Sequence, residues 1–243
     1  MYSRNETDNV TFASEQEAGT DSDGAPTVGF GVSGKLWNGV LVMYDRATGS
    51  LWTQIDGRAI EGDREGELLE HVASSYTTWG AWVAEHPDTL VLDKPEDVRG
   101  FEHSRYDAYL ADPERVFFPE LAEGLGELGP KGVVFGVRVA RAQAAVTETL
   151  MASDGLVNGL VGHVPVTWVR LASTGAVRAF DRRLDGQVLV LAFADEASPD
   201  TESLRDVLSG KAVRTDQLTE LRVDRAFWYA WKHSHPDSLL LRR

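Results

Sequence analysis

Residues 79–92 read WGAWVAEHPDTLVL, and residues 228–241 read WYAWKHSHPDSLLL. In each run, two tryptophans three positions apart share one helical face with the histidine that follows them. The proline after that histidine prevents the helix from continuing. Each run therefore predicts a short helix, over 77–85 in the first copy, followed by a strand such as 90–92. The tryptophans are expected to anchor each helix to a core.

A second pair of segments repeats in the same order. Residues 50–60, SLWTQIDGRAI, are echoed by residues 203–213, SLRDVLSGKAV. Ahead of the first segment, GVLVMYD at 39–45 reads as a strand, and 46–49 supplies a turn, so the two runs predict a β-hairpin. These repeats indicate a duplication. We predict a strand-dominated α+β fold of two duplicated units, each a β-meander with a short helix, packed with pseudo-twofold symmetry around a ligand cleft.

Composition divides the chain into three parts. Residues 1–25 are acidic, rich in Ser, Thr and Gly and poor in aliphatic residues, which predicts a disordered tail. Residues 26–130 form the first repeat unit, and its last part, from residue 93, is expected to be an ordered connection pinned by aromatic side chains. Residues 131–243 form the second unit, which can join the first in one domain. The pinning residues are expected to be Tyr106, Tyr109, Phe117 and Phe118. Strands are expected in the second unit at 133–139, 166–171, 177–182 and 187–193, with a short helix at 147–152.

Charge and cysteine content limit the possible functions. The chain has 243 residues, 24 basic and 38 acidic side chains, and no cysteine. Without cysteine there is no disulfide scaffold, thiolate metal site or cysteine nucleophile. The formal net charge of −14 argues against a nucleic-acid partner, because phosphate contacts need a basic surface. The same acidity is the basis of a further hypothesis, a halophilic origin in which salt screens the self-repulsion.

The sequence also makes predictions about location and partners. No apolar run is long enough to span a membrane, and Met1 is followed by polar residues rather than by an apolar signal region. We therefore expect a soluble, cytoplasmic protein that does not act on a membrane. Its partner is expected to be a small molecule or a protein, and the sequence predicts neither a cofactor nor a metal site.

Residues 29–34 match G-x-G-x-x-G, the pattern of dinucleotide-binding loops. Such a loop precedes a helix whose N-terminus faces the pyrophosphate. Here residues 35–44 read as a strand. We therefore interpret the glycines as a tight bend or bulge in a hairpin.

The His-Pro-Asp triplets can be interpreted in two ways. His86 and Asp88 have the residue types of a catalytic histidine–carboxylate pair, and His71 and His103 are further candidates. In the other interpretation, the histidine faces the negative end of the helix dipole and the aspartate bonds to the turn backbone. Both copies carry the triplet at one structural position, which favours the architectural interpretation.

The first hairpin is the candidate ligand-binding surface. Asn38, Asp45, Trp52 and Gln54 bring hydrogen-bonding groups and an indole to it, and strand alternation puts Trp52 and Gln54 on one face. The second copy has an arginine and a valine at the positions of Trp52 and Gln54, so a site here would belong to the first unit. An exposed strand face without a ligand is the alternative interpretation.

Several longer motifs, taken in order, resemble one bacterial and archaeal family, domain of unknown function 3179. The likeness spans about residues 22–241 and implies a duplicated β-rich fold, but no reaction. Family members commonly carry a paired-cysteine segment resembling Cys-Pro-Leu-Cys before the first motif, and this chain has no cysteine. The matching motifs lie at 30–38, 41–46, 50–54, 57–62, 79–92, 177–186 and 227–236.

From these observations we predict a ligand-binding or structural module that uses no thiol and has no catalysis of its own. One alternative is an enzyme that uses histidine and carboxylate groups, with or without a metal. Its candidate residues are His71, His86, His103, Asp45 and Asp88. The other is a truncated redox or metal protein whose cysteine segment lies upstream.

Overall fold

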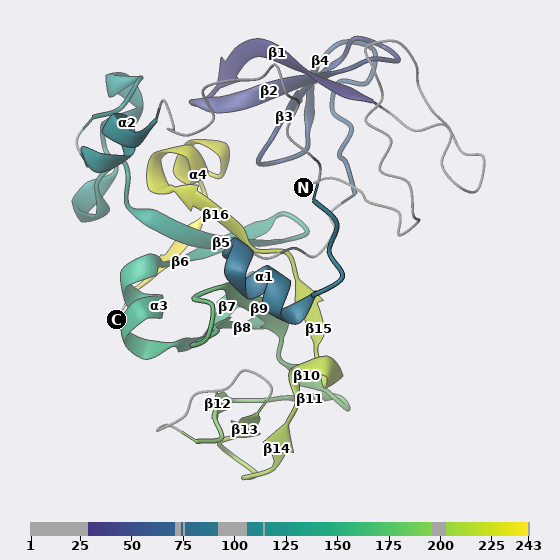
Figure 1. Cartoon of the computed structure of the whole chain (residues 1–243), viewed down its shortest axis with the longest axis vertical. Helices are drawn as coiled ribbons and strands as arrows, with labels where there is room; N and C mark the ends of the chain where they lie inside the picture. The colour runs from purple at the N-terminus through teal and green to yellow at the C-terminus, as the bar shows by residue number, and fades with distance from the viewer. Residues whose placement is uncertain are drawn as a thin grey trace. The chain divides into compact units, whose positions relative to one another are not determined.

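Figure 1 shows the computed structural model of the chain, which describes residues 29–70, 74, 76–91, 106–113, 115–195 and 203–242. The predicted tail, His71 and His103 lie outside these residues. Strands dominate the described part and the helices are short, which confirms the predicted class. Two compact units divide the chain at Val72/Ala73, and each has its own sheets. The pseudo-twofold packing and the repeat-unit boundary at residue 130 stay predictions.

The first unit is a four-stranded antiparallel meander. Its strands, in spatial order, are β1 Phe30–Trp37, β2 Val40–Asp45, β3 Leu51–Thr53 and β4 Ala59–Glu61. Asn38 and Gly39 form the turn from β1 to β2 with φ of 51° and 74°, as Asn-Gly does in a two-residue hairpin loop. The Trp52 side chain is fully buried, and the Phe30 ring meets it edge-on, with 5.9 Å between ring centroids. The indole is therefore the centre of this small unit.

The glycine pattern in β1 serves the hairpin, as predicted. A Cβ at Gly31 would lie 2.4 Å from the ring of Tyr44 on the facing strand, so a larger residue there would displace that ring. Gly34 has φ of 73°, and the pairing of β1 with β2 shifts register between Val32 and Leu36, which marks a bulge. A strand follows the glycines where a dinucleotide-binding loop needs a helix.

The second unit is built on two four-stranded sheets. Its strands are β5 Val133–Val139, β6 Ala142–Thr147, β7 Leu156–Val161, β8 Val164–Arg170, β9 Val177–Asp181, β10 Arg183–Leu184, β11 Gln187–Val188, β12 Leu191–Phe193, β13 Leu204–Asp206, β14 Ala212–Val213, β15 Thr219–Leu221, β16 Asp224–Phe227 and β17 Leu239–Leu241. Its helices are α1 Trp79–Glu85, α2 Asp107–Ala111, α3 Glu148–Asp154 and α4 Trp228–Ser234, with 3-10 turns at Pro119–Ala122, Gly126–Leu128 and Thr215–Gln217. One sheet has the order β16-β5-β6-β17, with β17 parallel to β6, and the other has the order β15-β9-β8-β7. Smaller sheets pair β10 with β11 and join β12, β13 and β14.

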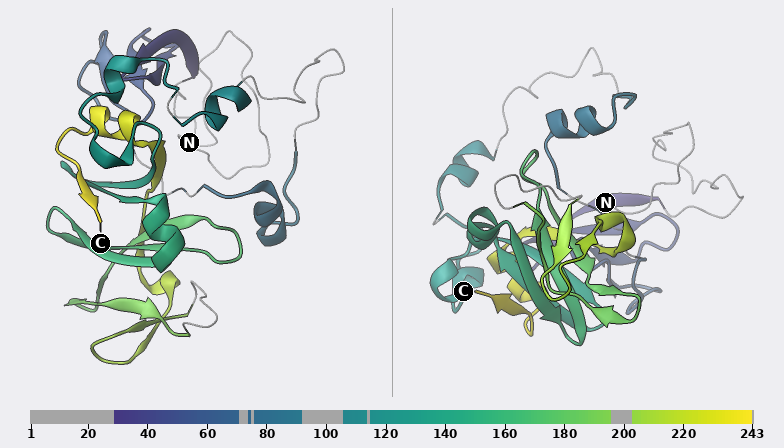
Figure 2. Two further views of the ribbon diagram at one scale, coloured as in Figure 1. Left: turned by 90° about the vertical axis from the view of Figure 1, so that its left-hand side faces the viewer. Right: turned by 90° about the horizontal axis from the view of Figure 1, so that it is seen from below.

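Two buried clusters hold the second unit together. The larger joins the two four-stranded sheets through residues of β5 to β9 and includes Met151 of α3. The smaller joins β8 and β9 to the β12-β13-β14 sheet through Val169, Phe180, Leu191 and Leu204. Helix α3 lies against β5 to β8 (Figure 2). The helix is thus fixed to the same core that carries both sheets.

The two repeated helices differ in burial. In α4, Trp228 and Trp231 are 4% and 0% exposed, which confirms the prediction that they anchor the helix. In α1, Trp79 and Trp82 are 58% and 40% exposed, so the same prediction is wrong there. The described part of the predicted strand 90–92 is not a strand either. Both corrections have one reason: within the described residues no sheet covers the tryptophans of α1.

Aromatic residues pin part of the connection that precedes β5. Tyr109 is buried, and its ring stacks on that of Phe117 with 4.3 Å between centroids. The Lys131 ammonium lies 3.5 Å from the centroid of the Tyr109 ring, a cation–π contact. Trp228 of α4 donates its Nε1–H to the carbonyl of Leu125 at 3.0 Å. These contacts fix the connection to the sheet on which α4 lies.

Candidate functional site

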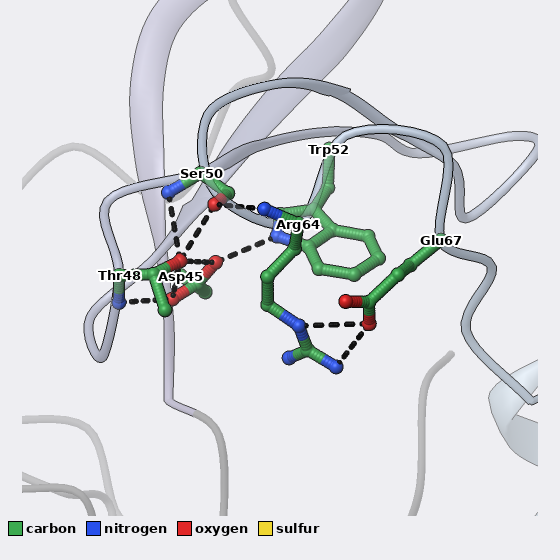
Figure 3. Close-up of polar contacts among 6 residues, drawn as sticks. All are labelled: Asp45, Thr48, Ser50, Trp52, Arg64 and Glu67. Atoms are coloured by element: carbon green, nitrogen blue, oxygen red, sulfur yellow. Dashed lines mark hydrogen bonds and ion pairs between the residues drawn. The ribbon is translucent and has the colours of Figure 1, made fainter.

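The first hairpin holds a buried carboxylate in a closed hydrogen-bond network (Figure 3). Asp45 ends β2 and is 0% exposed. Its Oδ1 accepts the backbone N–H of Thr48 at 2.6 Å, and its Oδ2 accepts the Nε1–H of Trp52 at 2.9 Å. The Thr48 hydroxyl lies 3.0 Å from Oδ1 and 2.8 Å from Oδ2. The carboxylate therefore fixes its own loop and the neighbouring strand together.

These bonds also set the protonation of Asp45. Burial by itself raises the pKa of this carboxyl, but the hydrogen bonds from Trp52 and Thr48 outweigh burial and hold the pKa below its usual value. A general acid or base near neutral pH needs a pKa close to that pH. The surroundings of Asp45 therefore suit a structural brace better than proton transfer.

A second layer of contacts surrounds this network. Ser50 Oγ accepts the backbone N–H of Arg64 at 3.2 Å. The Arg64 guanidinium lies 5.0 Å from the centroid of the Trp52 ring and donates to Glu67 from Nε and Nη2 at 2.9 and 2.7 Å (Figure 3). Gly62 has φ of 101°, and a Cβ there would lie 2.8 Å from the Ser50 backbone. The segment after β4 is thus held closely over the hairpin loop.

The same loop occurs again in the second unit. Asp206 ends β13, and its Oδ2 accepts the backbone N–H and the hydroxyl of Ser209 at 2.9 and 2.6 Å. These bonds, with one from the N–H of Val190, lower the pKa of Asp206 from 3.8 to about 2. In both loops the glycine N–H donates to the aspartate carbonyl, at 2.9 Å for Gly49 and 2.8 Å for Gly210. A D-x-x-[TS]-G sequence therefore builds the same braced loop twice.

The four residues of the predicted ligand surface have different surroundings. The structure brings Asp45 and Trp52 together, and the Trp52 Nε1–H donates a hydrogen bond to Asp45 Oδ2. Asn38 lies in the turn between β1 and β2, and Gln54 is exposed in the loop after β3, because β3 ends at Thr53. Alternation along a strand therefore does not apply to Gln54. A ligand surface formed by all four residues stays a prediction.

His86 and Asp88 lie at the end of α1. The N–H of His86 donates to the carbonyl of Trp82 at 2.8 Å, and the two rings are 4.0 Å apart. His235 ends α4 in the same way, 4.2 Å from the ring of Trp231. This shared geometry supports the helix-stop interpretation of the triplets. The other two candidate histidines are outside the described residues.

A groove of about 540 Å³ opens between α3, β7 and β12 in the second unit. Asn158 of β7 closes its floor, because Nδ2 donates to the Leu191 carbonyl at 2.8 Å and Oδ1 accepts the Leu191 N–H at 3.2 Å. Gly155 ends α3 with φ of 68°, and a Cβ there would lie 3.0 Å from the Phe193 ring. The groove is lined by Met151, Ala152, Ser153, Asp154, Gly155, Leu156, Asn158, Arg170, Ala172, Leu191, Ala192 and Phe193.

Arg170 is the basic side chain of this groove. It ends β8, is half-buried, and makes no side-chain hydrogen bond or ion pair with any residue that the structure describes. The acidic group in the same groove, Asp154, accepts the Ser153 hydroxyl at 2.7 Å. This groove could not be predicted from the sequence, because its residues come from four separate elements and share no motif. The unpaired guanidinium is therefore a signal that only the folded chain reveals.

Two features are absent from the part of the chain that the structure describes. No group of three or more His, Cys, Asp or Glu side chains there is arranged to hold a metal ion. Among the described helices, none is both long and apolar enough to cross a membrane.

These features define a β-rich α+β protein with a braced hairpin in one unit and an arginine-lined groove in the other. The chain belongs to the family described as protein of unknown function DUF3179, whose model matches residues 10–238. This match confirms the family resemblance of the sequence motifs. No curated protein and no solved structure matches the chain.

Proposed function

We propose that this chain is a binding module that uses no thiol and has no catalysis of its own. Its ligand is a small molecule with one anionic group, held in the groove between α3, β7 and β12. The observation that carries this proposal is Arg170, whose guanidinium lines a groove of about 540 Å³ without a partner among the described residues.

The chemistry of the groove supports this class of ligand. An arginine presents a rigid fork of donors that matches a carboxylate or phosphate. Leu156, Ala172 and Phe193 offer apolar surface for the rest of the molecule. The negative charge of Asp154 disfavours a ligand with a second anionic group. A monocarboxylate or phosphate monoester with an apolar part therefore fits best.

The role that we assign to the first hairpin is structural. The oxygens of Asp45 already accept hydrogen bonds from Thr48 and Trp52 within the hairpin. The equivalent loop at Asp206 is braced in the same way. A motif that builds the same loop in two places is explained by architecture.

The test is a thermal-shift screen of the full chain against monocarboxylates and phosphate monoesters. We expect at least one compound to raise the melting temperature, and calorimetry on that compound to show a tenfold or greater loss of affinity in Arg170→Gln. Arg141→Gln is the matched control, because it removes the same charge from an exposed turn outside the groove. Equal affinity in the two variants, or no stabilising compound, would contradict the proposal.

A further inference from the structure

Residues 76–91 are the first copy of a repeated segment whose second copy contains α4, and the two copies have the same local geometry. His86 ends α1 at φ −129° and ψ 71°, and His235 ends α4 at φ −131° and ψ 72°. Trp82 Nε1 donates to the Thr89 hydroxyl at 2.9 Å, and Trp231 Nε1 donates to the Ser238 hydroxyl at 2.8 Å. Residues 76–91 therefore have the same local conformation as the segment that contains α4.

The contacts of the second copy show which surface this conformation packs against. Trp231 lies on Gly136 of β5, so closely that a Cβ at Gly136 would be 2.3 Å from the indole. Strand β16, just before α4, pairs with β5, and strand β17, just after α4, pairs with β6. The segment thus covers one face of the β5–β6 hairpin and extends the sheet at both edges.

In the first copy the corresponding side chains are exposed. Trp82 is 40% exposed, whereas Trp231 is 0% exposed. Leu90 and Val91, the counterparts of two β17 residues, are 94% and 67% exposed and are not in a strand. Tyr76 lies ahead of α1, and the Arg225 guanidinium is 5.0 Å from the centroid of the Tyr76 ring. Tyr76 is nevertheless 65% exposed. Exposed aromatic and aliphatic side chains gathered in this way mark interaction surfaces.

We propose that residues 76–91 are a docking site for a β-hairpin of another polypeptide. That hairpin carries a glycine under Trp82, as β5 carries Gly136 under Trp231. Residues 90–91 then pair along its edge, in the mode of β-strand addition.

A second copy of this chain is a poor occupant. Its β5–β6 hairpin is already covered by α4 and β17, so accepting α1 would release an equivalent helix and strand. The exchange brings no net gain of contacts, and a hairpin with a free face and free edges is favoured instead.

The test uses a cyclised peptide with the sequence of residues 131–148, which contains the hairpin that α4 covers. Cyclisation preforms the hairpin, because isolated two-stranded hairpins are marginally stable. Titration into the full chain is expected to give saturable binding by calorimetry. A peptide with Gly136→Val should lose at least tenfold in affinity, because the larger side chain occupies the place of the indole.

Variants of the full chain locate the binding surface. Trp82→Ala and Leu90→Lys should each weaken peptide binding at least tenfold, with unchanged circular dichroism. Trp37→Ala is the control, since it removes a tryptophan that is 49% exposed in the first unit. Three results would overturn the proposal: no binding of the peptide, binding unaffected by Trp82→Ala, or self-association of the chain that Trp82→Ala abolishes.

Discussion

At Asp45, donors from one loop and from the next strand meet on a single carboxylate. Asp206 gathers donors in the same way from its loop and from the residue before β12. In both loops a carboxylate accepts more hydrogen bonds than a neutral amide could, because a carboxylate has only acceptors. The pairing of Asp45 with Trp52 could be anticipated in part, because both belong to one hairpin motif. The bond between their side chains depends on the register of β2 and β3.

Asn in place of Asp45 should destabilise the protein. The amide nitrogen of Asp45→Asn cannot accept, so one of the N–H groups from Thr48 or Trp52 loses its partner inside the hairpin. We expect the free energy of unfolding to fall by about 1–3 kcal/mol, the usual cost of an unsatisfied buried donor. Urea denaturation measures it, with the exposed Asp63→Asn as the control. An equal effect in the two variants would show that the network does not stabilise the hairpin.

Asp206 should make stability depend on pH in acid. Its pKa is lowered from 3.8 to about 2, so its stabilising effect is complete above about pH 4 and is lost as the pH falls toward 2. Asp206→Asn should therefore be less stable than the wild type at pH 5, with the difference shrinking between pH 4 and pH 2. Denaturation curves at several pH values test this. A difference that does not change with pH would mean that the ionised carboxylate is not the stabilising species.

Among the elements, those with a strong local pattern could be predicted from the sequence. Strand β5 spans the predicted residues 133–139, whose run of valines is typical of a buried strand. Strands β6 and β7 were missed, because the first is rich in alanine and the second contains Asn158 and Gly159. Their pairing with β5 and β8 decides their structure. The groove was missed for a related reason, since it exists only where α3, β7 and β12 meet.

The contrast between α4 and α1 gives a prediction about two equivalent tryptophans. Trp231→Ala should lower the free energy of unfolding by about 3–5 kcal/mol, because it leaves a cavity over Gly136. Trp82→Ala should change it by about 0.5 kcal/mol or less, because the Trp82 side chain is exposed and its removal leaves no buried cavity. Chemical denaturation of both variants measures the difference. Similar losses would mean that Trp82 is covered in solution.

At the scale of the whole molecule, net charge is the property whose effect on stability depends most on the salt concentration. The formal net charge is −14, and self-repulsion of this kind destabilises the compact state. The screening length shortens from about 10 Å at 0.1 M salt to about 3 Å at 1 M.

We therefore expect the melting temperature to rise between 0.1 and 1 M KCl, because the added salt screens the repulsion between like charges. Differential scanning calorimetry measures it, and sucrose at matched viscosity serves as the control for non-ionic effects. A melting temperature that stays constant or falls with KCl would contradict both the repulsion argument and the halophilic hypothesis.

We assign different roles to the two units. The first contains a braced hairpin with a structural role, and the second contains the ligand-binding groove with Arg170. The most direct test of this division is chemical-shift mapping on the ¹⁵N-labelled full chain with the compound that stabilises it most in the thermal screen. We predict that the shifted amides cluster at 151–158, 170–172 and 191–193. Shifts centred instead on Asp45, Trp52 and their neighbours would show that the ligand binds the first hairpin, and would contradict the account.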